Sequence, residues 1–145
     1  MGGKRWCVVT AAQLAASLIA VFEGCKLTAY QDSGGIWTIG FGHTGPDIHL
    51  RMTITQDQAN AYFEHDVAPL LVAVADKPIL EAAALVSFGY NAGLSAMKKV
   101  MAGTSDMSTF IHDAHGNVLS YLQRRRALEM ALIEVSKRIP MGLLV

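Results

Sequence analysis

Apolar residues recur at helical spacing near the start of the chain, between about residues 11 and 22. Thr10 and Gln13 before them occupy the two positions of a capping box, in which each side chain bonds the backbone amide of the other residue. Glu23-Gly24 follows the last periodic residue, and glycine commonly ends a helix. The pattern therefore predicts a helix over residues 11–22.

The pattern changes between Leu27 and His43, where residues typical of strands surround the turn sequence Asp32-Ser-Gly-Gly35. We expect a hairpin or a small meander in this region. Side chains alternate between the two faces of a strand, which places Thr38 on the face that otherwise carries glycines. That face should be open to an approaching substrate.

Helical patterns dominate the rest of the sequence. Two further capping boxes, at Thr55 and Ser120, mark helix starts, and Pro69 is expected to kink or end the first of these helices. Between them the pattern predicts helices over about residues 78–91 and 95–102, and one or two helical turns around residues 108–113.

The last helix should stop before Pro140 and should bury a stripe of Leu128, Leu132 and Val135. One short β region among several helices predicts an α+β fold that is mostly helical. The 145 residues fit a single domain, which buries about two-thirds of the surface that its unfolded chain exposes.

Basic and acidic side chains balance at 12 each, but they are unevenly placed. Residues 1–96 carry 5 basic and 8 acidic side chains, and residues 97–145 carry 7 and 4. A nucleic-acid binder is normally more basic, so we expect no nucleic-acid partner. Cys7 and Cys25 would lie at opposite ends of a helix about 20 Å long, whereas a disulfide needs Cα atoms within about 7 Å. We expect both to be free thiols.

No charged side chain interrupts the stretch from Trp6 to Phe22, which follows Lys4-Arg5. Such a stretch can be a signal peptide or a short membrane anchor. Three polar residues interrupt it here, however, and cleavage would remove the helix that ends beside Glu23. We therefore expect no export signal and no stable membrane insertion.

Candidate chemistry is concentrated in Glu23, Asp32 and Thr38. A carboxyl between Phe22 and Leu27 at the end of an apolar helix would be partly desolvated, which favours the protonated acid. Asp32 in a Gly-rich turn would stay hydrated and ionised, able to activate a water that the Thr38 hydroxyl holds. Hydrolysis of a glycosidic bond needs such an acid and base. Both acidic residues are also ordinary capping and turn choices, so residue types alone leave the structural interpretation open.

A longer motif contains these residues. The pattern Glu-Gly-x-x-Leu-x-Ala-Tyr-x-Asp-x-x-Gly-x-x-Thr-Ile-Gly-x-Gly-His runs from Glu23 to His43. It resembles the signature of the phage lysozymes (endolysins, glycoside hydrolase family 24). Asp66 falls where that family has an aspartate, and further segments are similar at residues 53–59, 84–93 and 125–129. The resemblance covers roughly residues 10–135.

The resemblance implies hydrolysis of the β-1,4 bond between N-acetylmuramic acid and N-acetylglucosamine in peptidoglycan, with Glu23, Asp32 and Thr38 at the catalytic positions. It implies a lysozyme-like fold in which two lobes flank an active-site cleft. A small β-hairpin lobe would span about residues 23–55, and a helical lobe about residues 56–140 plus the first helix.

The same resemblance implies glycan strands of bacterial peptidoglycan as the partner, with no cofactor and no metal. We expect a monomer that stays in the host bacterial cytoplasm until a separate holin-type membrane pore releases it to the cell wall. The spacings of the five histidines do not predict a metal site.

Four residues are expected to support the catalytic positions. By the resemblance, His43 and Asp66 form an ion pair that ties the β region to the following helix. Arg125 lies in the first turns of a helix, where the macrodipole disfavours cations, so we expect it to pair with Glu23 or to hold an anionic cell-wall group. A solvated arginine is the alternative. Asn91 resembles a cleft-facing position that binds an N-acetyl group, or it caps its helix.

Residues 98–121 depart from the family pattern, because residues 98–103 are abbreviated and the region around Phe110 lacks a tryptophan. These departures concern the helical wall of the cleft and could weaken or narrow the activity. The alternative function is a catalytically weak peptidoglycan-binding protein that retains the fold. A metal-dependent amidase would need ligands that the sequence does not provide.

Overall fold

A small antiparallel sheet and five α-helices make up residues 9–32 and 34–139, the part of the chain that the computed structural model describes. In chain order the elements are α1 (Ala11–Glu23), β1 (Lys26–Gln31), β2 (Trp37–Gly40), β3 (His43–Thr44), α2 (Gln56–Ala73), α3 (Ile79–Ala92), α4 (Leu94–Met101), the 3-10 helix η1 (Met107–Thr109) and α5 (Ser120–Arg138). The mostly helical α+β class is confirmed.

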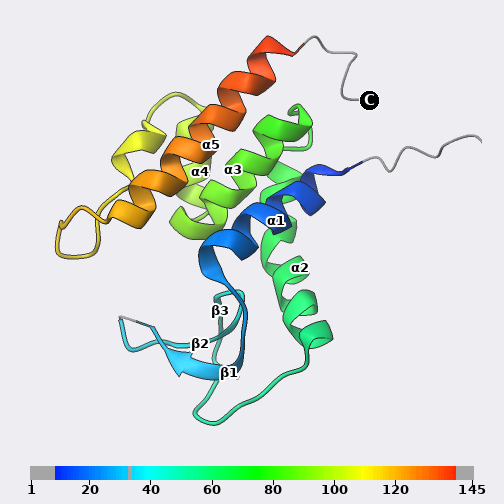
Figure 1. Cartoon of the computed structure of the whole chain (residues 1–145), viewed down its shortest axis with the longest axis vertical. Helices are drawn as coiled ribbons and strands as arrows, with labels where there is room; N and C mark the ends of the chain where they lie inside the picture. The colour runs from blue at the N-terminus through cyan, green and yellow to red at the C-terminus, as the bar shows by residue number, and fades with distance from the viewer. Residues whose placement is uncertain (1–8, 33, 140–145) are drawn as a thin grey trace, which may run out of the picture.

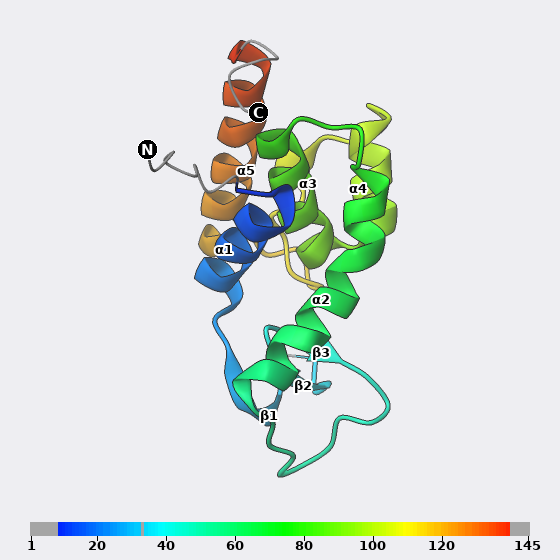
Figure 2. The ribbon, with the colours of Figure 1, turned by 90° about the vertical axis from the view of Figure 1, so that its right-hand side faces the viewer.

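The sheet forms a small lobe at one end of the molecule, and α1, α3, α4 and α5 form a helical lobe at the other (Figure 1). α2 runs from the sheet into the helical lobe (Figure 2). α3 contacts α1, α2, α4 and α5. Because every residue from Ala82 to Gly89 is buried, α3 forms the centre of the helical core.

The first helix begins and ends as its local sequence predicts. The Gln13 N–H donates to the Thr10 hydroxyl over 3.2 Å, and the Thr10 N–H donates to the Gln13 side chain over 2.9 Å. Ala15 and Ile19 bury the inner face of α1. Gly24 follows with φ of 66°, a conformation that glycine adopts without steric cost. Glu23 is therefore held as the last residue of α1.

The predicted meander is confirmed by the antiparallel strand order β1-β2-β3. The Asp32 N–H donates to the Ile36 carbonyl over 3.0 Å and closes the turn between β1 and β2. In the register Tyr30 lies opposite Thr38, which in turn lies opposite Thr44. This lobe has its own small core, made of the buried side chains Ile39, Ile48, Ile54 and Ala59.

Two details of the helix ends differ from the predictions. Of the two effects predicted for Pro69, ending the helix is wrong, because α2 continues to Ala73. Burial of Val67 and Leu70 in the core outweighs the one backbone hydrogen bond that proline removes. The predicted helix start at Ser120 is confirmed, but the capping box is wrong, because Leu119 is the N-cap of α5 and no side-chain hydrogen bond caps this end.

The buried face of α5 also differs from the prediction. Leu128 and Val135 are 40% and 46% exposed and Leu132 is half-buried, so the expected stripe is not the buried face of the helix. The buried residues are Leu122, Arg125, Arg126, Glu129 and Ser136. Ion pairs join Glu129 to both arginines, and these allow charged groups to replace an apolar face.

Among the described helices, none combines the length and apolar character needed to cross a membrane. Cys25 is an exposed free thiol. The expectation for Cys7 lies outside the described residues.

Candidate active site

Glu23 stands where the chain passes from the helical lobe to the sheet lobe, and its side chain is 28% exposed. The Nη1 group of Arg125 donates to Oε1 of Glu23. Phe22 lies beside the pair, with the Arg125 guanidinium 5.0 Å from the centre of its ring. Of the roles expected for Arg125, pairing with Glu23 is the one that the structure contains.

Arg125 is itself fixed on its other sides. Only 1% of its surface is exposed. Its Nη2 group donates to the Ser87 carbonyl over 2.9 Å, and Nε donates to Oε1 of Glu129 over 3.1 Å. The guanidinium therefore faces Glu23 from a rigid and buried position.

Asp32 is exposed in the turn between β1 and β2 and is oriented by that turn. Its Oδ1 accepts the N–H groups of Gly34 and Ile36 over 2.8 and 2.9 Å. Among the described residues, Oδ2 has no hydrogen-bond partner. One oxygen thus holds the turn, and the other is available to water.

Thr38 does not lie on an open face as expected, because it is only 4% exposed. Its hydroxyl donates to the Ile36 carbonyl over 3.0 Å. A Cβ placed on the neighbouring Gly40 would lie 3.5 Å from the Ala59 side chain of α2. Because Gly40 has no side chain, α2 packs closely against β2 at this position, and the face is not open there.

Tyr30 is a site residue that sequence reasoning missed. Burial raises the pKa of its hydroxyl, and the charges of Glu23 and Asp32 raise it further. The charges of both carboxylates therefore influence Tyr30, which lies opposite Thr38 in the sheet. The sequence does not give the register between β1 and β2, so the position of Tyr30 opposite Thr38 could not be predicted from it.

Asn91 lies in the last turn of α3 and is exposed. Its Oδ1 accepts a hydrogen bond from Nη2 of Arg126, which orients the side-chain amide. Asn91 does not occupy the C-cap, which is Gly93. The amide NH₂ group is the part of Asn91 that remains to donate to a ligand.

The expected pair of His43 and Asp66 is confirmed. Nδ1 of His43 lies 2.7 Å from Oδ2 of Asp66, so β3 is joined to α2. The ring of Tyr62 stacks on His43 with a centroid distance of 4.1 Å. In the described part of the chain, no group of three or more potential metal ligands converges.

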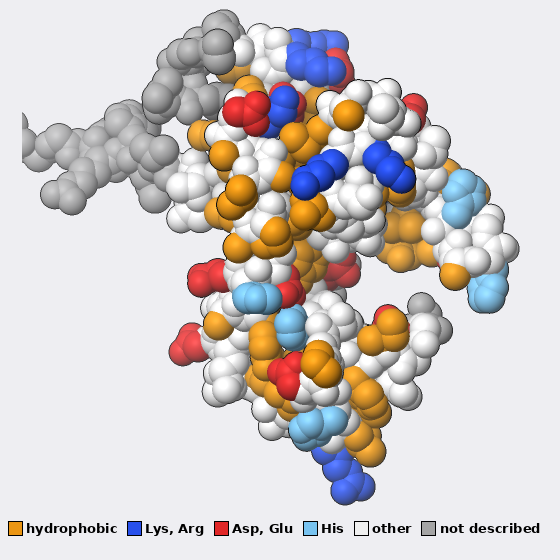
Figure 3. All heavy atoms as spheres, turned by 180° about the vertical axis from the view of Figure 1, so that it is seen from behind, with side chains coloured by type: hydrophobic (Ala, Val, Ile, Leu, Met, Phe, Trp, Pro, Cys, Tyr) orange, Lys and Arg blue, Asp and Glu red, His pale blue; other side chains and the backbone are white. Residues whose placement is uncertain are grey.

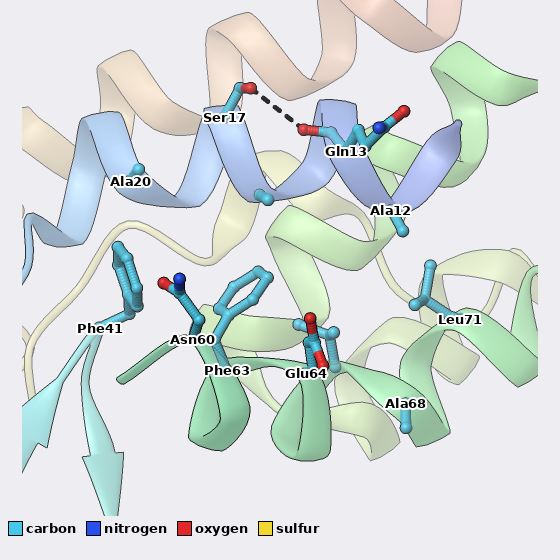
Figure 4. Close-up of a pocket in the computed structure, with 12 residues that line it drawn as sticks. Ala12, Gln13, Ser17, Ala20, Phe41, Asn60, Phe63, Glu64, Ala68 and Leu71 are labelled. Atoms are coloured by element: carbon cyan, nitrogen blue, oxygen red, sulfur yellow. Dashed lines mark hydrogen bonds between the residues drawn. The ribbon is translucent and has the colours of Figure 1, made fainter. Parts of the chain in front are cut away.

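Two hollows mark the surface. Seen from behind, the molecule is hollowed between the sheet lobe and the helical lobe (Figure 3). A separate apolar groove of about 510 Å³ lies between α1 and α2, with Phe63 and Leu71 on one wall and alanines on the other (Figure 4). Glu64 is the one titratable side chain among the described residues of this groove. Among its described lining residues, the groove therefore lacks the pair of carboxyls that acid–base hydrolysis of a glycosidic bond needs.

Comparison with known proteins gives a consistent result. Residues 20–129 match the phage lysozyme family. The endolysin of Acyrthosiphon pisum secondary endosymbiont phage 1 is 32% identical over 136 residues, which cover 81% of this chain and 92% of that protein. The endolysin of Bacillus phage PZA is 33% identical over 138 residues, which cover 83% of this chain. The match spans 53% of the length of that endolysin.

Solved structures agree. The endolysin from Escherichia coli O157:H7 phage FAHEc1 superposes with a TM-score of 0.71 at 30% identity, covering 91% of this chain and 95% of that one. The muramidase domain of SpmX from Asticaccaulis excentricus gives a TM-score of 0.68 at 30% identity, covering 88% and 97%.

Proposed function

Because the chain belongs to the phage lysozyme family and is a glycoside hydrolase that acts on peptidoglycan, we propose that Glu23 is its general acid. Asp32 and Thr38 position the attacking water. The bond that is cut joins N-acetylmuramic acid to N-acetylglucosamine. This assignment rests on the motif from Glu23 to His43 and on where the fold holds its members.

One observation supports the carboxyl pair more than any other. Glu23 ends α1 and its carboxyl is held by Arg125, whereas Asp32 begins the turn after β1 and its carboxyl is held by N–H groups of that turn. The two carboxyls therefore flank β1, and the charge of each raises the pKa of the Tyr30 hydroxyl on that strand. Hydrolysis by an acid and a base needs carboxyls on opposite sides of the bond that is cut, and this bond would lie beside Tyr30.

The proton transfers follow from the hydrogen bonds of each carboxyl. Oε1 of Glu23 accepts from Arg125, which leaves Oε2 to carry the proton that passes to the leaving glycosidic oxygen. Oδ1 of Asp32 is held by the turn, so Oδ2 receives the proton of the water that attacks the anomeric carbon. The water oxygen forms the new bond, and the glycosidic C–O bond breaks as Glu23 donates.

Thr38 and Asn91 have supporting roles. The Thr38 hydroxyl donates to the Ile36 carbonyl, so its lone pairs can accept a hydrogen bond from the water. Asn91 would donate from its amide nitrogen to the carbonyl of an N-acetyl group. Arg125 does not bind the glycan in this proposal, because its guanidinium is buried and engaged.

Relatives of this chain are phage endolysins, which act at the cell wall. We propose that a separate membrane pore releases this enzyme, since α1 is packed in the helical lobe through Ala15 and Ile19. Fractionation of expressing cells tests this route. Recovery in the membrane fraction would contradict it, and lysis that depends on a co-expressed pore would support it.

The function is tested by analysis of the muropeptides released from purified peptidoglycan. We expect fragments whose reducing end is N-acetylmuramic acid. Reducing-end N-acetylglucosamine, or free peptides without cleaved glycan, would contradict the proposal. Binding to the wall without any release would instead indicate a peptidoglycan-binding protein.

The same digest reports stereochemistry. If a water on the far side of the ring attacks directly, the new reducing end appears first as the α anomer, by inversion of the β bond. NMR of the digest at early times distinguishes the anomers. Initial release of the β anomer would indicate a covalent intermediate on Asp32.

A further inference from the structure

The buried face of α5 carries two arginines and a glutamate. Arg125, Arg126 and Glu129 are 1%, 2% and 0% exposed, and they are among the largest fully buried side chains of the described structure. Charged residues are rarely buried to this extent, because removing an ion from water costs several kcal/mol in a protein. The proposed chemistry uses Arg125 but leaves Glu129 without a role.

Glu129 is bonded at both oxygens. Oε1 accepts from Nε of Arg125 over 3.1 Å and from the Ser87 hydroxyl over 2.7 Å. Oε2 accepts from Nη1 of Arg126. Burial raises the pKa of Glu129, and the attraction of the two guanidiniums opposes that effect.

Each arginine uses its remaining donors on a different residue of the site. Arg125 reaches Glu23, and Arg126 reaches Asn91. Arg126 also donates from Nε to the Phe110 carbonyl over 3.2 Å, and its guanidinium lies 4.7 Å from the centre of the Phe88 ring. One carboxylate therefore determines the direction of two guanidiniums that contact the site.

The charges of the cluster are balanced. Two carboxylates, Glu23 and Glu129, face two guanidiniums. Without Glu129, two buried guanidiniums would face one carboxylate, and the cluster beside Glu23 would carry a net positive charge. A general acid must bind a proton before each turnover, so this balance matters for catalysis.

We propose that Glu129 is a positioning residue for the general acid: it directs Arg125 to Glu23 and Arg126 to Asn91, and its charge keeps the surroundings of Glu23 neutral. This inference rests on the proposed role of Glu23.

The test compares variants that change the cluster charge in opposite directions. Glu129→Gln adds one net positive charge and favours ionised Glu23, so the alkaline limb of the pH profile of kcat should move to lower pH. Arg126→Met removes one positive charge, and the limb should move to higher pH. The double variant restores neutrality and should return the limb toward the wild-type position. Initial rates on soluble peptidoglycan fragments, measured from pH 4 to 9, give the alkaline limb of the pH profile for each of the three variants and for the wild type.

A control on the same helix separates electrostatics at the site from a change of charge elsewhere. Glu134→Gln makes the same chemical change on the exposed face of α5, where the side chain is 56% exposed, and should alter neither limb nor kcat. Circular dichroism shows which variants are folded.

In a folded Glu129→Gln variant we also expect kcat to fall about tenfold, with KM changed less than twofold. If that variant does not fold, Arg126→Met and the double variant still give limbs to compare. Limbs that coincide in all folded variants would overturn the role of Glu129. Full activity of Glu23→Gln would instead overturn the proposed function itself, so the two failures are distinguishable.

Discussion

Arg125 shows how a single side chain links the hydrophobic core to the chemistry. Its guanidinium donates in three directions, to Glu23, to Glu129 and to the Ser87 carbonyl. A planar guanidinium can satisfy all three acceptors at once, whereas an ammonium group is a compact charge on a flexible stem. The carboxyl of Glu23 is thus held by a group that is itself immobile.

Arg125→Lys tests this role, because lysine keeps the charge and loses the geometry. We expect kcat to fall at least about tenfold, equivalent to about 1.4 kcal/mol of transition-state stabilisation. The free energy of unfolding should fall by about 3 kcal/mol, since Glu129 loses a buried partner. Arg124→Lys, at an exposed position on the same helix, is the matched control. Unchanged kcat in Arg125→Lys would show that the pair with Glu23 is not needed.

At the scale of elements, local signals predicted local structure. The capping box at Thr10 and the turn sequence after Asp32 sufficed for α1 and for the hairpin. The buried face of α5 could not be predicted in this way, because Arg125 and Glu23 are 102 positions apart and hydrophobic periodicity assigns charges to the surface. The burial of Thr38 was not predicted for a similar reason, since α2 packs against β2 and is distant from it in the sequence.

The packing of α3 gives a prediction for Gly89. A Cβ at this position would lie 2.8 Å from Sδ of Met97 and 2.9 Å from Cδ2 of Leu70. Gly89→Ala should therefore lower the free energy of unfolding by about 1–3 kcal/mol, although alanine favours a helix by about 0.5–1 kcal/mol. Urea denaturation measures the change. A stabilised variant would mean that the contact between α3, α2 and α4 is looser than described.

At the scale of the whole molecule, side-chain contacts near the junction of the two lobes hold the sheet lobe to the helices. Arg125 of α5 reaches Glu23 at the end of α1, where the chain enters the sheet lobe, and His43 on β3 pairs with Asp66 on α2. The Tyr90 hydroxyl of α3 donates to the Phe41 carbonyl over 3.1 Å. These contacts fix the lobes on either side of the hollow between them (Figure 3).

The Tyr90 contact makes stability sensitive to alkaline pH. Burial, followed by the charge of Asp66, raises the pKa of Tyr90 above its ordinary value of 10.0. The folded state therefore favours the protonated hydroxyl, so its contribution is fully present below pH 10 and is lost as the pH rises further. Urea denaturation at pH 8 and pH 10.5 should show a larger loss for the wild type than for Tyr90→Phe. Equal losses would contradict the assignment.

The central claim is that Glu23 is the general acid, and Glu23→Gln tests it most directly. Glutamine keeps the shape and can still accept from Arg125, but it has no proton to give to the leaving oxygen. The measurement is the rate at which the purified, folded variant clears a suspension of peptidoglycan, beside the wild type. We predict a loss of at least about a thousandfold, in the range for removal of an acid catalyst. Clearing at the wild-type rate would contradict the account.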